Sequence, residues 1–455
     1  MKKFYITTAI DYVNAKPHIG HAFEKVLADA IARWHAQKGE KVWFLTGTDE
    51  NAQKNVQAAK DLKVPVKQFV GKNSGFFIEL CEKLNLSNND FIRTTEERHA
   101  KICKEIVKKV YKKGDIYKGS YQGLYCYGCE AYKTEKELVN GRCWEHPNRE
   151  IVELKEEAYF FKLSKYKKQI EKFVKECVVP ESRGKEILNR LNEEDLKDLC
   201  ITRKGSDWGI DFPLDKSFKI YVWFDALVNY ISGASGNWPA DLHVIGKGIN
   251  WFHSVIWPAI LLSADYELPK NILVHEYLNL EGQKMSKSLG NVIDPLQLIE
   301  KYGTDSVRYS LLKCSVFADS DFNEEIVINR NNELADKLGN LVSRVAVLIE
   351  KYGTSKIESK LLKKIKLKEI EKHFNRYETD KVLSEIFAFI DLCNEYISNK
   401  KPWETHDKKV LYELKESILK IAELLFPFIP ENSEKITKQF SAKNIKKQEI
   451  LFKKI

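Results

Sequence analysis

Apolar side chains recur at two different spacings along the first fifty residues of the chain. Residues 4–10 form a short apolar run that is typical of a β-strand, and residues 42–45 form another. Between them, residues 22–38 carry apolar side chains at helical spacing up to Gly39, a residue type that often follows a helix end. A strand, a helix and a second strand in this order predict a parallel sheet with helices on its faces.

The pattern changes twice further along the chain. Residues 115–215 contain a segment rich in Tyr, Cys and Gly followed by charged helical stretches, which predicts an insertion between two halves of a sheet domain. Short apolar strands are expected again at residues 220–224, 242–245 and 272–275, and residues 323–440 keep only helical spacing. The predicted fold class is therefore α/β, with a parallel-sheet domain and an insertion, followed by an all-α helix bundle.

Length and composition narrow the class of protein. The chain has 455 residues, of which 43% are hydrophobic and 31% charged, as expected for a folded protein of several domains. No stretch approaches about 18 apolar residues, so no membrane span is expected. Nine mostly isolated cysteines in so long a chain indicate reduced thiols and a cytoplasmic location. The net charge of +9 permits binding of a polyanion but does not establish it.

The first candidate site is the sequence Pro17-His18-Ile19-Gly20-His21, where the first predicted strand gives way to the first predicted helix. A helix N-terminus offers backbone N–H groups and the positive end of the helix dipole, both of which suit phosphate. Gly20 would let a ligand approach the backbone, and the two imidazoles could donate hydrogen bonds to phosphate oxygens in a transition state. The alternative is that His18 and His21 only cap the helix or face solvent.

A second candidate is the stretch 284–288, Lys-Met-Ser-Lys-Ser, which follows a predicted strand and lies between two glycines. It is expected to be a mobile loop. The ammonium groups of Lys284 and Lys287 could clamp a triphosphate and neutralise a departing pyrophosphate. Taken alone, such a stretch is equally compatible with an ordinary solvated loop.

A third candidate consists of two short pairs of metal-ligating residues with thirteen residues between the pairs: Cys126, Cys129, Cys143 and His146. Three thiolates and one imidazole at this spacing match a closed, structural zinc site. A redox Cys-x-x-Cys pair or free core cysteines are alternatives, and the second pair argues against both. Glu130 and Glu145 are nearby oxygen donors, but a carboxylate is a poorer match beside thiolates.

The order and context of the histidine and lysine motifs resemble those of class I aminoacyl-tRNA synthetases. Further stretches narrow the resemblance to methionyl-tRNA synthetases over nearly the whole chain: residues 7–14, 44–50, 91–95, 221–227 and 257–259. The resemblance implies that the chain activates L-methionine with ATP and Mg²⁺ and transfers it to the 3′ end of tRNA(Met). It also implies that ATP binding and catalysis rest on residues of the two motifs: His18, Gly20, His21, Lys284 and Lys287.

The resemblance further implies a methionine pocket made of eight residues: Ile10, Tyr12, Asp49, Trp223, Ala226, Tyr230, Phe252 and His253. Asp49 would pair with the ammonium group of the substrate. Trp223, Tyr12 and Phe252 would surround the thioether, whose soft sulfur packs well against aromatic rings. His253 or Tyr12 would hydrogen-bond the sulfur. The alternative is that these aromatic residues belong to the hydrophobic core.

In the helical C-terminal part, Asn340, Arg344 and Trp403 are similar to anticodon-reading positions of the family. Asn340 and Arg344 are four residues apart, so they share one helix face. An amide and a guanidinium suit base edges, and an indole suits stacking on an unpaired base. Trp403 could instead belong to the core of the helix bundle.

The resemblance assigns a role to each predicted segment. The two halves of a Rossmann-like catalytic domain are expected at 1–114 and 217–275, with a connective insertion between them at 115–216 that contains a zinc knuckle at 126–146. A stem-contact region with the lysine loop follows at 276–325, and an α-helical anticodon-binding domain at 326–455. No dimerisation module is visible after the helical domain, so a monomer is expected.

The chain departs from the family pattern at a few positions. Ala9 and Asp11 replace residues that the family often has there, and Asn51-Ala52 stands where the family often has His-Gly. Gly248 replaces an Asp that contacts the ATP ribose, so we expect another group to make that contact.

Two other functions compete with this interpretation. One is a class I synthetase for another apolar or sulfur-containing amino acid, and the pocket discriminates against it, because a purely aliphatic substrate would not require Trp223, Tyr12 and His253 together. The other is a non-catalytic tRNA-binding paralogue, which is expected to lack His18, His21 or Lys287, and all three are present.

Overall fold

A computed structural model describes most of the chain: residues 2–128, 131–133, 135, 138–144, 146–204, 206–280, 282–284 and 292–455. The chain forms two compact units. The first consists of Met1–Lys16, Gly39–Glu79 and Asn88–His275, and the second of Pro17–Lys38, Leu80–Ser87 and Glu276–Ile455.

The first unit is built on a parallel sheet. Within the described residues it has seven strands: β1 (Lys3–Thr8), β2 (Asp11–Tyr12), β3 (Lys41–Asp49), β4 (Asp90–Arg93), β10 (Val178–Val179), β14 (Leu242–Gly246) and β15 (Ile272–His275). Their order is β10-β15-β14-β1-β3, and both β2 and β4 pair with β3 in parallel register. The central strand β1 is buried along nearly its whole length, because a parallel sheet is covered on both faces.

Helices of the first unit connect these strands. They are α2 (Gln53–Asp61), α4 (Glu97–Lys112), α5 (Lys167–Cys177), α6 (Glu181–Glu193), α7 (Val222–Leu227), α8 (Asn229–Ser232) and α9 (Trp257–Ser263). The helix α3 (Val66–Lys83) begins in the first unit and ends in the second. A π-helical turn, η4 (Phe252–Ile256), leads into α9.

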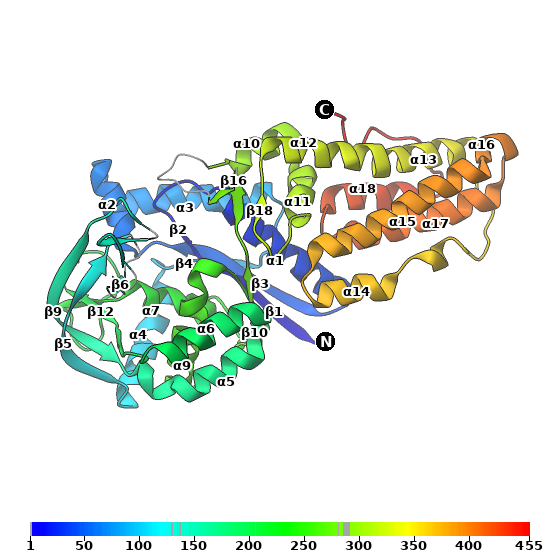
Figure 1. The fold of residues 1–455 in the computed structure, drawn as a ribbon. Coiled ribbons are helices and arrows are strands. Elements are labelled where there is room, and N and C mark those ends of the chain that lie inside the picture. Colours follow the sequence, from blue (N-terminus) through cyan, green and yellow to red (C-terminus); the bar gives the residue numbers. More distant parts are fainter. Residues whose placement is uncertain are drawn as a thin grey trace. The chain divides into compact units, whose positions relative to one another are not determined.

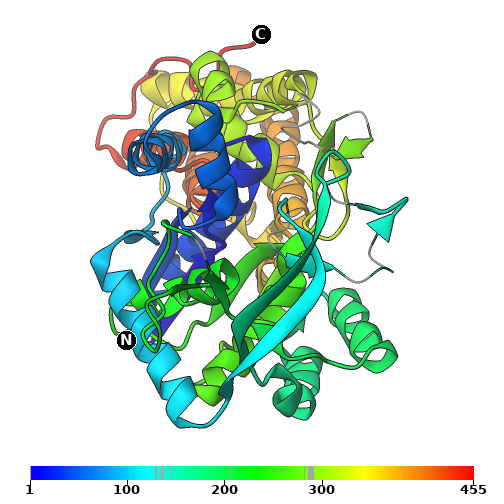
Figure 2. The same cartoon turned by 90° about the vertical axis from the view of Figure 1, so that its left-hand side faces the viewer.

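A second, antiparallel sheet accounts for much of the predicted insertion. It has the order β11-β9-β5-β6, with bounds β5 (Ile116–Cys126), β6 (Ala131–Lys133), β9 (Ile151–Phe161) and β11 (Leu199–Cys200). The strands β5 and β9 pair along their whole length and curve together (Figure 1), and they run side by side in the second view as well (Figure 2). A small hairpin is formed by β7 (Leu138–Val139) and β8 (Arg142–Cys143), and a further antiparallel pair by β12 (Thr202–Lys204) and β13 (Phe218–Ile220).

The second unit is mostly helical. Its helices are α1 (Ile19–Gln37), α10 (Pro295–Tyr302), α11 (Thr304–Leu312), α12 (Glu324–Glu333), α13 (Asn340–Tyr352), α14 (Leu367–Asn375), α15 (Thr379–Lys400), α16 (Pro402–Thr405), α17 (Lys408–Leu425) and α18 (Pro430–Ser441). Three short strands form a small sheet: β16 (Leu278–Leu280), β17 (Gln283–Lys284) and β18 (Ser320–Asp321). The helices α13, α15 and α17 run alongside one another as a bundle (Figure 1).

A buried ion pair fixes α1 within the second unit. Arg308 on α11 lies 2.6 Å from the Asp29 carboxylate on α1, and both side chains are fully buried. Burial alone would raise the pKa of Asp29, but Arg308 and Arg33 lower it overall, so the carboxylate stays charged. Arg308 also donates to backbone carbonyls of residues 427 and 428, which ties α1 and α11 to the end of the bundle.

The predicted architecture, an α/β domain with an insertion followed by a helix bundle, is confirmed. The strand predicted at residues 272–275 matches β15, and that predicted at 242–245 falls within β14. The strand predicted at 220–224 is wrong, because the chain turns into the helix α7 at Val222. A short apolar run buried on all sides has the same pattern in either state, so periodicity does not distinguish them.

The described residues include no helix that is both long and apolar enough to cross a membrane.

Candidate active site

The histidine motif forms the N-terminal cap of α1. His18 is the N-cap residue, and its Nδ1 accepts a hydrogen bond from the backbone N–H of Gly20 (3.1 Å). The Nδ1 of His21 accepts from the backbone N–H of His18 (2.9 Å). Because both Nδ1 atoms accept, each neutral ring carries its proton on Nε2. The two histidines therefore cap the helix and also supply Nε2–H donors at its positive end.

Gly20 has little room for a side chain. A Cβ at Gly20 would lie 3.0 Å from Cε1 and 3.1 Å from Nδ1 of His18. The first turn of α1, all of which is described, contains no acidic residue, so no carboxylate of that turn offsets the positive end of the helix. This helix start is therefore suited to an anion such as phosphate.

Described residues before and after the lysine stretch make backbone contacts within the second unit. Before it, the backbone of Lys284 pairs with Asn279 across the β16–β17 hairpin. After it, the carbonyl of Ile293 accepts a hydrogen bond from the backbone N–H of Ile19 in the first turn of α1 (3.0 Å). Lys287 lies outside the described residues, and only the backbone of Lys284 is described. The chain that leaves the lysine motif thus returns to the histidine motif.

Asp49 stands at the C-terminal end of β3. It pairs in register with Tyr12 of β2 and is only 3% exposed. Its Oδ1 accepts a hydrogen bond from the backbone N–H of Asn51 (3.2 Å). Open parallel sheets bind ligands beyond the carboxyl ends of their strands, so Asp49 is a buried carboxylate where a ligand is expected.

The residue that follows, Glu50, holds this end of β3 in place. Its fully buried carboxylate makes a two-point ion pair with Arg93 at the end of β4 (2.6 and 3.1 Å). The hydroxyls of Ser74 and Thr95 also donate to it, and the indole of Trp208 donates to its backbone carbonyl (2.8 Å). A buried carboxylate is tolerated when it is paired and hydrogen-bonded in this way.

Three aromatic side chains gather near this end of the sheet. Trp223 on α7 stacks on Phe252, with ring centroids 3.5 Å apart and planes 10° apart. Tyr12 meets Trp223 edge-on at 6.2 Å, and the Nζ of Lys54 lies 2.9 Å from the Tyr12 ring centroid. The three rings pack in one cluster with Ala52. Phe252 opens the π-helical turn η4, a geometry that recurs at functional sites.

Tyr230 and His253 form a buried polar pair. The Nδ1 of His253 donates to the carbonyl of Ile249 (2.9 Å), so Nε2 is unprotonated in the neutral ring and accepts the Tyr230 hydroxyl (2.7 Å). In this tautomer both ring nitrogens have protein partners. His253 could therefore donate to a further acceptor only after it is protonated.

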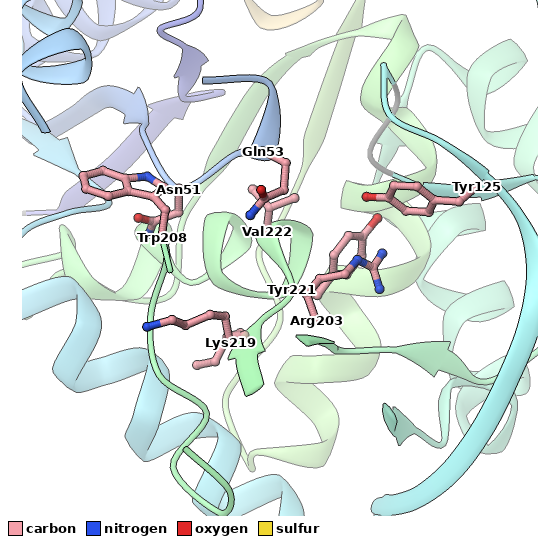
Figure 3. A pocket seen from close by; sticks show the side chains of 9 residues that line it. Asn51, Gln53, Tyr125, Arg203, Trp208, Lys219, Tyr221 and Val222 are labelled. Carbon is pink, nitrogen blue, oxygen red and sulfur yellow. The ribbon is translucent and has the colours of Figure 1, made fainter. Parts of the chain in front are cut away.

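A pocket that the sequence did not reveal opens on the same unit. It is a shallow recess open to solvent, and the side chains that line it are shown in Figure 3: Asn51, Gln53, Tyr125, Arg203, Trp208, Lys219, Ile220, Tyr221 and Val222. The Arg203 guanidinium lies over the rings of Tyr221 and Tyr125, at 4.3 and 4.9 Å from their centroids. These residues come from distant parts of the sequence, and the basic pair at residues 203–204 is the one signal that could have pointed to them.

Three of the four predicted metal ligands come together. The ligand atoms of Cys126, Cys143 and His146 all lie within 4.8 Å of one another. Gly128 packs directly against the imidazole, because a Cβ there would lie 2.4 Å from a ring carbon of His146. Cys129 lies outside the described residues. Two thiols and an imidazole in this arrangement form a candidate metal site.

The predicted anticodon residues lie on the surface of the helix bundle. Asn340 and Arg344 are exposed on α13. Trp403 on α16 is 38% exposed, so its ring is not part of the bundle core. The Arg344 guanidinium lies 5.7 Å from the centroid of the Trp403 ring, which makes a joint cationic and aromatic surface.

Comparisons with known proteins bear on the family. The sequence family described as "tRNA synthetases class I (M)" matches residues 4–151 and 134–346, and the "Anticodon-binding domain of tRNA ligase" family matches residues 356–454. The methionine–tRNA ligase of Clostridium acetobutylicum is 42% identical, over 97% of this chain and 73% of that protein. This chain belongs to the methionyl-tRNA synthetase family. It is a ligase that forms aminoacyl-tRNA, as predicted.

Other methionyl-tRNA synthetases agree with this assignment. The methionine–tRNA ligase of Rickettsia conorii is 40% identical, over 99% of this chain and 94% of its own length. The structure of Mycobacterium tuberculosis methionyl-tRNA synthetase in complex with methionyl-adenylate matches with a TM-score of 0.92 and 35% identity, and covers 98% of this chain and 96% of that one. Its apo form matches with a TM-score of 0.85 and 31% identity, over 100% of this chain and 98% of that one.

The predicted site residues of this synthetase are divided between the two units according to their predicted roles. All eight predicted methionine-pocket residues belong to the first unit. The histidine motif, Lys284 and the predicted anticodon residues belong to the second. Their individual roles remain predictions, as do the predicted domain boundaries. One observation bears on those boundaries, because β10, which lies within residues 115–216, joins the central parallel sheet.

Proposed function

We propose that the chain carries out the reaction of its family in two steps, through the residues described above. The carboxylate of L-methionine attacks the α-phosphate of ATP, which is bound with Mg²⁺, to give methionyl-adenylate, and pyrophosphate leaves. The 3′-terminal hydroxyl of tRNA(Met) then attacks the methionyl carbonyl, and AMP leaves. Membership of the methionyl-tRNA synthetase family supports the overall reaction, and the geometry supports the following roles.

The observation that carries the methionine assignment is the combination of a buried carboxylate and an aromatic cluster at one end of the sheet. Asp49 pairs with the substrate ammonium group. Trp223 and Phe252 pack against the thioether. Since both nitrogens of His253 already have protein partners, the hydroxyl of Tyr12 is the group we assign to the sulfur. An aliphatic substrate would not call for this arrangement.

Adenylate formation relies on positioning and charge stabilisation, without a covalent enzyme intermediate. The first turn of α1 receives phosphate, and Gly20 allows its close approach to the backbone. His18 and His21 donate from Nε2 to phosphate oxygens as charge builds up. Lys284 and Lys287 neutralise the departing pyrophosphate.

The C-terminal helices read the anticodon. Asn340 and Arg344 contact base edges from one face of α13, and an unpaired base stacks on Trp403. The exposure of all three residues and the contact between Arg344 and Trp403 support this assignment.

The metal site holds one structural Zn²⁺. Cys126, Cys143 and His146 would supply three ligands, and Cys129 would supply the fourth. Bound there, the ion would link β5 to the β7–β8 hairpin and would take no part in either chemical step. We further propose that the enzyme works as a monomer in the cytoplasm.

Methionine-dependent exchange between ATP and labelled pyrophosphate tests the proposal, with leucine, isoleucine, valine and cysteine assayed in parallel. Exchange with methionine alone is expected. Exchange with another of these amino acids would keep the mechanism and overturn the substrate, whereas no exchange with any would favour a tRNA-binding paralogue. Charging of tRNA(Met) transcripts then tests the second step.

A further inference from the structure

Asn51 is hydrogen-bonded to two sides of the proposed methionine pocket: the Asp49 carboxylate, and the helix α7, which carries Trp223 and is called the α7 wall below. Asn51 follows β3 and is only 7% exposed. Its Nδ2 donates to the carboxylate of Asp225 on α7 (3.1 Å) and to the backbone carbonyl of Thr94 (3.1 Å). Its backbone N–H donates to the carboxylate of Asp49 (3.2 Å).

Asp225 links Asn51 to the α7 wall, because it lies on the same helix as Trp223. It is fully buried on α7, between Trp223 and Ala226 in sequence. On its other side it faces His99, whose Nε2 lies 3.5 Å from its Oδ1. Burial lowers the pKa of His99 to about 3, so that ring is neutral at physiological pH. The His99 ring therefore brings no positive charge to Asp225. The amide of Asn51 donates a hydrogen bond to this carboxylate and does not titrate.

We propose that Asn51 is a positioning residue that sets the separation between Asp49 and the α7 wall, and thereby the length of the amino-acid side chain that the pocket accepts. The inference rests on the proposed function, since it needs Asp49 to hold the ammonium group and Trp223 to meet the side chain. The Asn51 amide hydrogens serve Thr94 and Asp225, so the residue acts on the substrate through them.

The physical reason lies in the buried carboxylate. A buried charge that loses a hydrogen-bond donor moves toward another donor or toward water. Asp225 is part of a short helix, so its displacement also moves Trp223 and Ala226. A looser wall tolerates a longer thioether better than the native wall does, and it binds methionine less tightly.

The experiment compares L-methionine with L-ethionine, which is one methylene longer, in pyrophosphate exchange. The measured quantity is the ratio of kcat/KM for the two amino acids in one preparation, which does not depend on the fraction of folded enzyme. The variants are Asn51→Ala, Asn51→Asp and the exchanged pair Asn51→Asp with Asp225→Asn. The matched control is Asn331→Ala, because Asn331 is a buried asparagine of the second unit that also makes two side-chain hydrogen bonds.

We expect the preference for methionine to fall at least about fivefold in Asn51→Ala and Asn51→Asp, through a raised KM for methionine. The exchanged pair should recover part of the preference, because it restores one donor facing one acceptor. Asn331→Ala should keep the wild-type ratio even if it lowers the unfolding temperature.

An unchanged ratio in Asn51→Asp, in an enzyme that still exchanges pyrophosphate, would overturn the positioning role and leave the proposed function standing. A wild-type chain that shows no methionine-dependent exchange would overturn both. If Asn51→Ala does not accumulate as folded protein, the isosteric Asn51→Asp and the exchanged pair decide the question.

Discussion

The backbone N–H of Ile19 donates a hydrogen bond to the carbonyl of Ile293, with 3.0 Å between nitrogen and oxygen. Ile19 is the first residue of α1, and Ile293 follows the lysine motif by a few residues. Asp294, the next residue, caps α10 by accepting from the N–H of Leu296 (2.9 Å). Residues 293 and 294, which follow the lysine stretch, are thus held at two helix starts, one of which carries the histidine motif.

This arrangement leads to a prediction for the lysine motif. Lys287→Ala should slow methionine-dependent pyrophosphate exchange at least about tenfold, because a cation that stabilises the leaving group is lost. The matched control is Lys301→Ala, which removes an exposed lysine paired with Glu324 on α12. The control should exchange at the wild-type rate, and an unchanged rate in Lys287→Ala would remove that residue from the mechanism.

The two functions of His18, capping and catalysis, can be separated by substitution. Asparagine is a favoured N-cap residue, so His18→Asn should still accept from the N–H of Gly20 and leave thermal unfolding nearly unchanged. It cannot supply the Nε2–H donor, and pyrophosphate exchange should fall about a hundredfold. His18→Ala should lose the same activity and, in addition, about 1 kcal/mol of stability. Full activity in His18→Asn would mean that the histidine serves only as a cap.

The sequence predicts those parts of the fold and the site that follow from a local pattern of residues, and it does not predict those that depend on side-chain conformation. The strand at 272–275 is recognisable as a short run of apolar residues. Such a run is typical of a strand in a parallel sheet covered on both faces, and all four of its residues are buried. The histidine motif is recognisable as a helix start from its place after a strand. Its reciprocal capping by the two Nδ1 atoms is not, since that depends on side-chain rotamers.

Other features depend on tertiary contacts between distant residues. The bond from Asn51 to Asp225 joins positions 174 apart in the sequence, and no local pattern encodes it. The helix α7 reads as a strand because every residue in it is buried, which removes the polar face that normally reveals a helix. The exposure of Trp403 could not be predicted either, because aromatic residues are more often found in the core than on the surface.

The contact between Gly128 and His146 makes the metal site testable without touching a ligand. A Cβ at residue 128 would lie 2.4 Å from the imidazole, so Gly128→Ala should displace His146 and lower bound zinc from about one to well under half an ion per chain. Gly75→Ala is the control, because a Cβ there would meet no atom within 4 Å. Zinc content is read by mass spectrometry of the metal. Retention of a full ion by Gly128→Ala would contradict the proposed ligand set.

The exposed ring of Trp403 predicts an effect on tRNA alone. Trp403→Ala should lower kcat/KM for tRNA(Met) charging at least about tenfold, since stacking on one base contributes about 1–3 kcal/mol. Pyrophosphate exchange without tRNA should not change. Tyr111→Ala, which removes another exposed aromatic ring from α4 of the first unit, should affect neither assay. Unimpaired charging by Trp403→Ala would argue that bases stack elsewhere.

A buried carboxyl in the second unit predicts how stability depends on pH. Asp305 on α11 accepts from the backbone N–H and the side-chain amide of Asn432 (2.7 and 2.8 Å), and burial raises its pKa to about 6. Between the unfolded pKa near 3.8 and the folded value, the folded state binds more protons than the unfolded state. This carboxyl therefore destabilises the fold increasingly as pH rises through that window, with its full effect above about pH 6.

Replacing the ionisable group should remove this term. Asp305→Asn keeps an oxygen acceptor for Asn432 and cannot ionise. Its free energy of unfolding minus that of the wild type should therefore be larger, meaning a relatively more stable variant, at pH 7.5 than at pH 4.5 by about 2 kcal/mol. Urea unfolding followed by circular dichroism at the two pH values measures this difference, and groups that titrate alike in both proteins cancel. A difference that stays constant with pH would mean that Asp305 has the same pKa in the folded and unfolded chains, and its burial would then have to be compensated by Arg308 nearby.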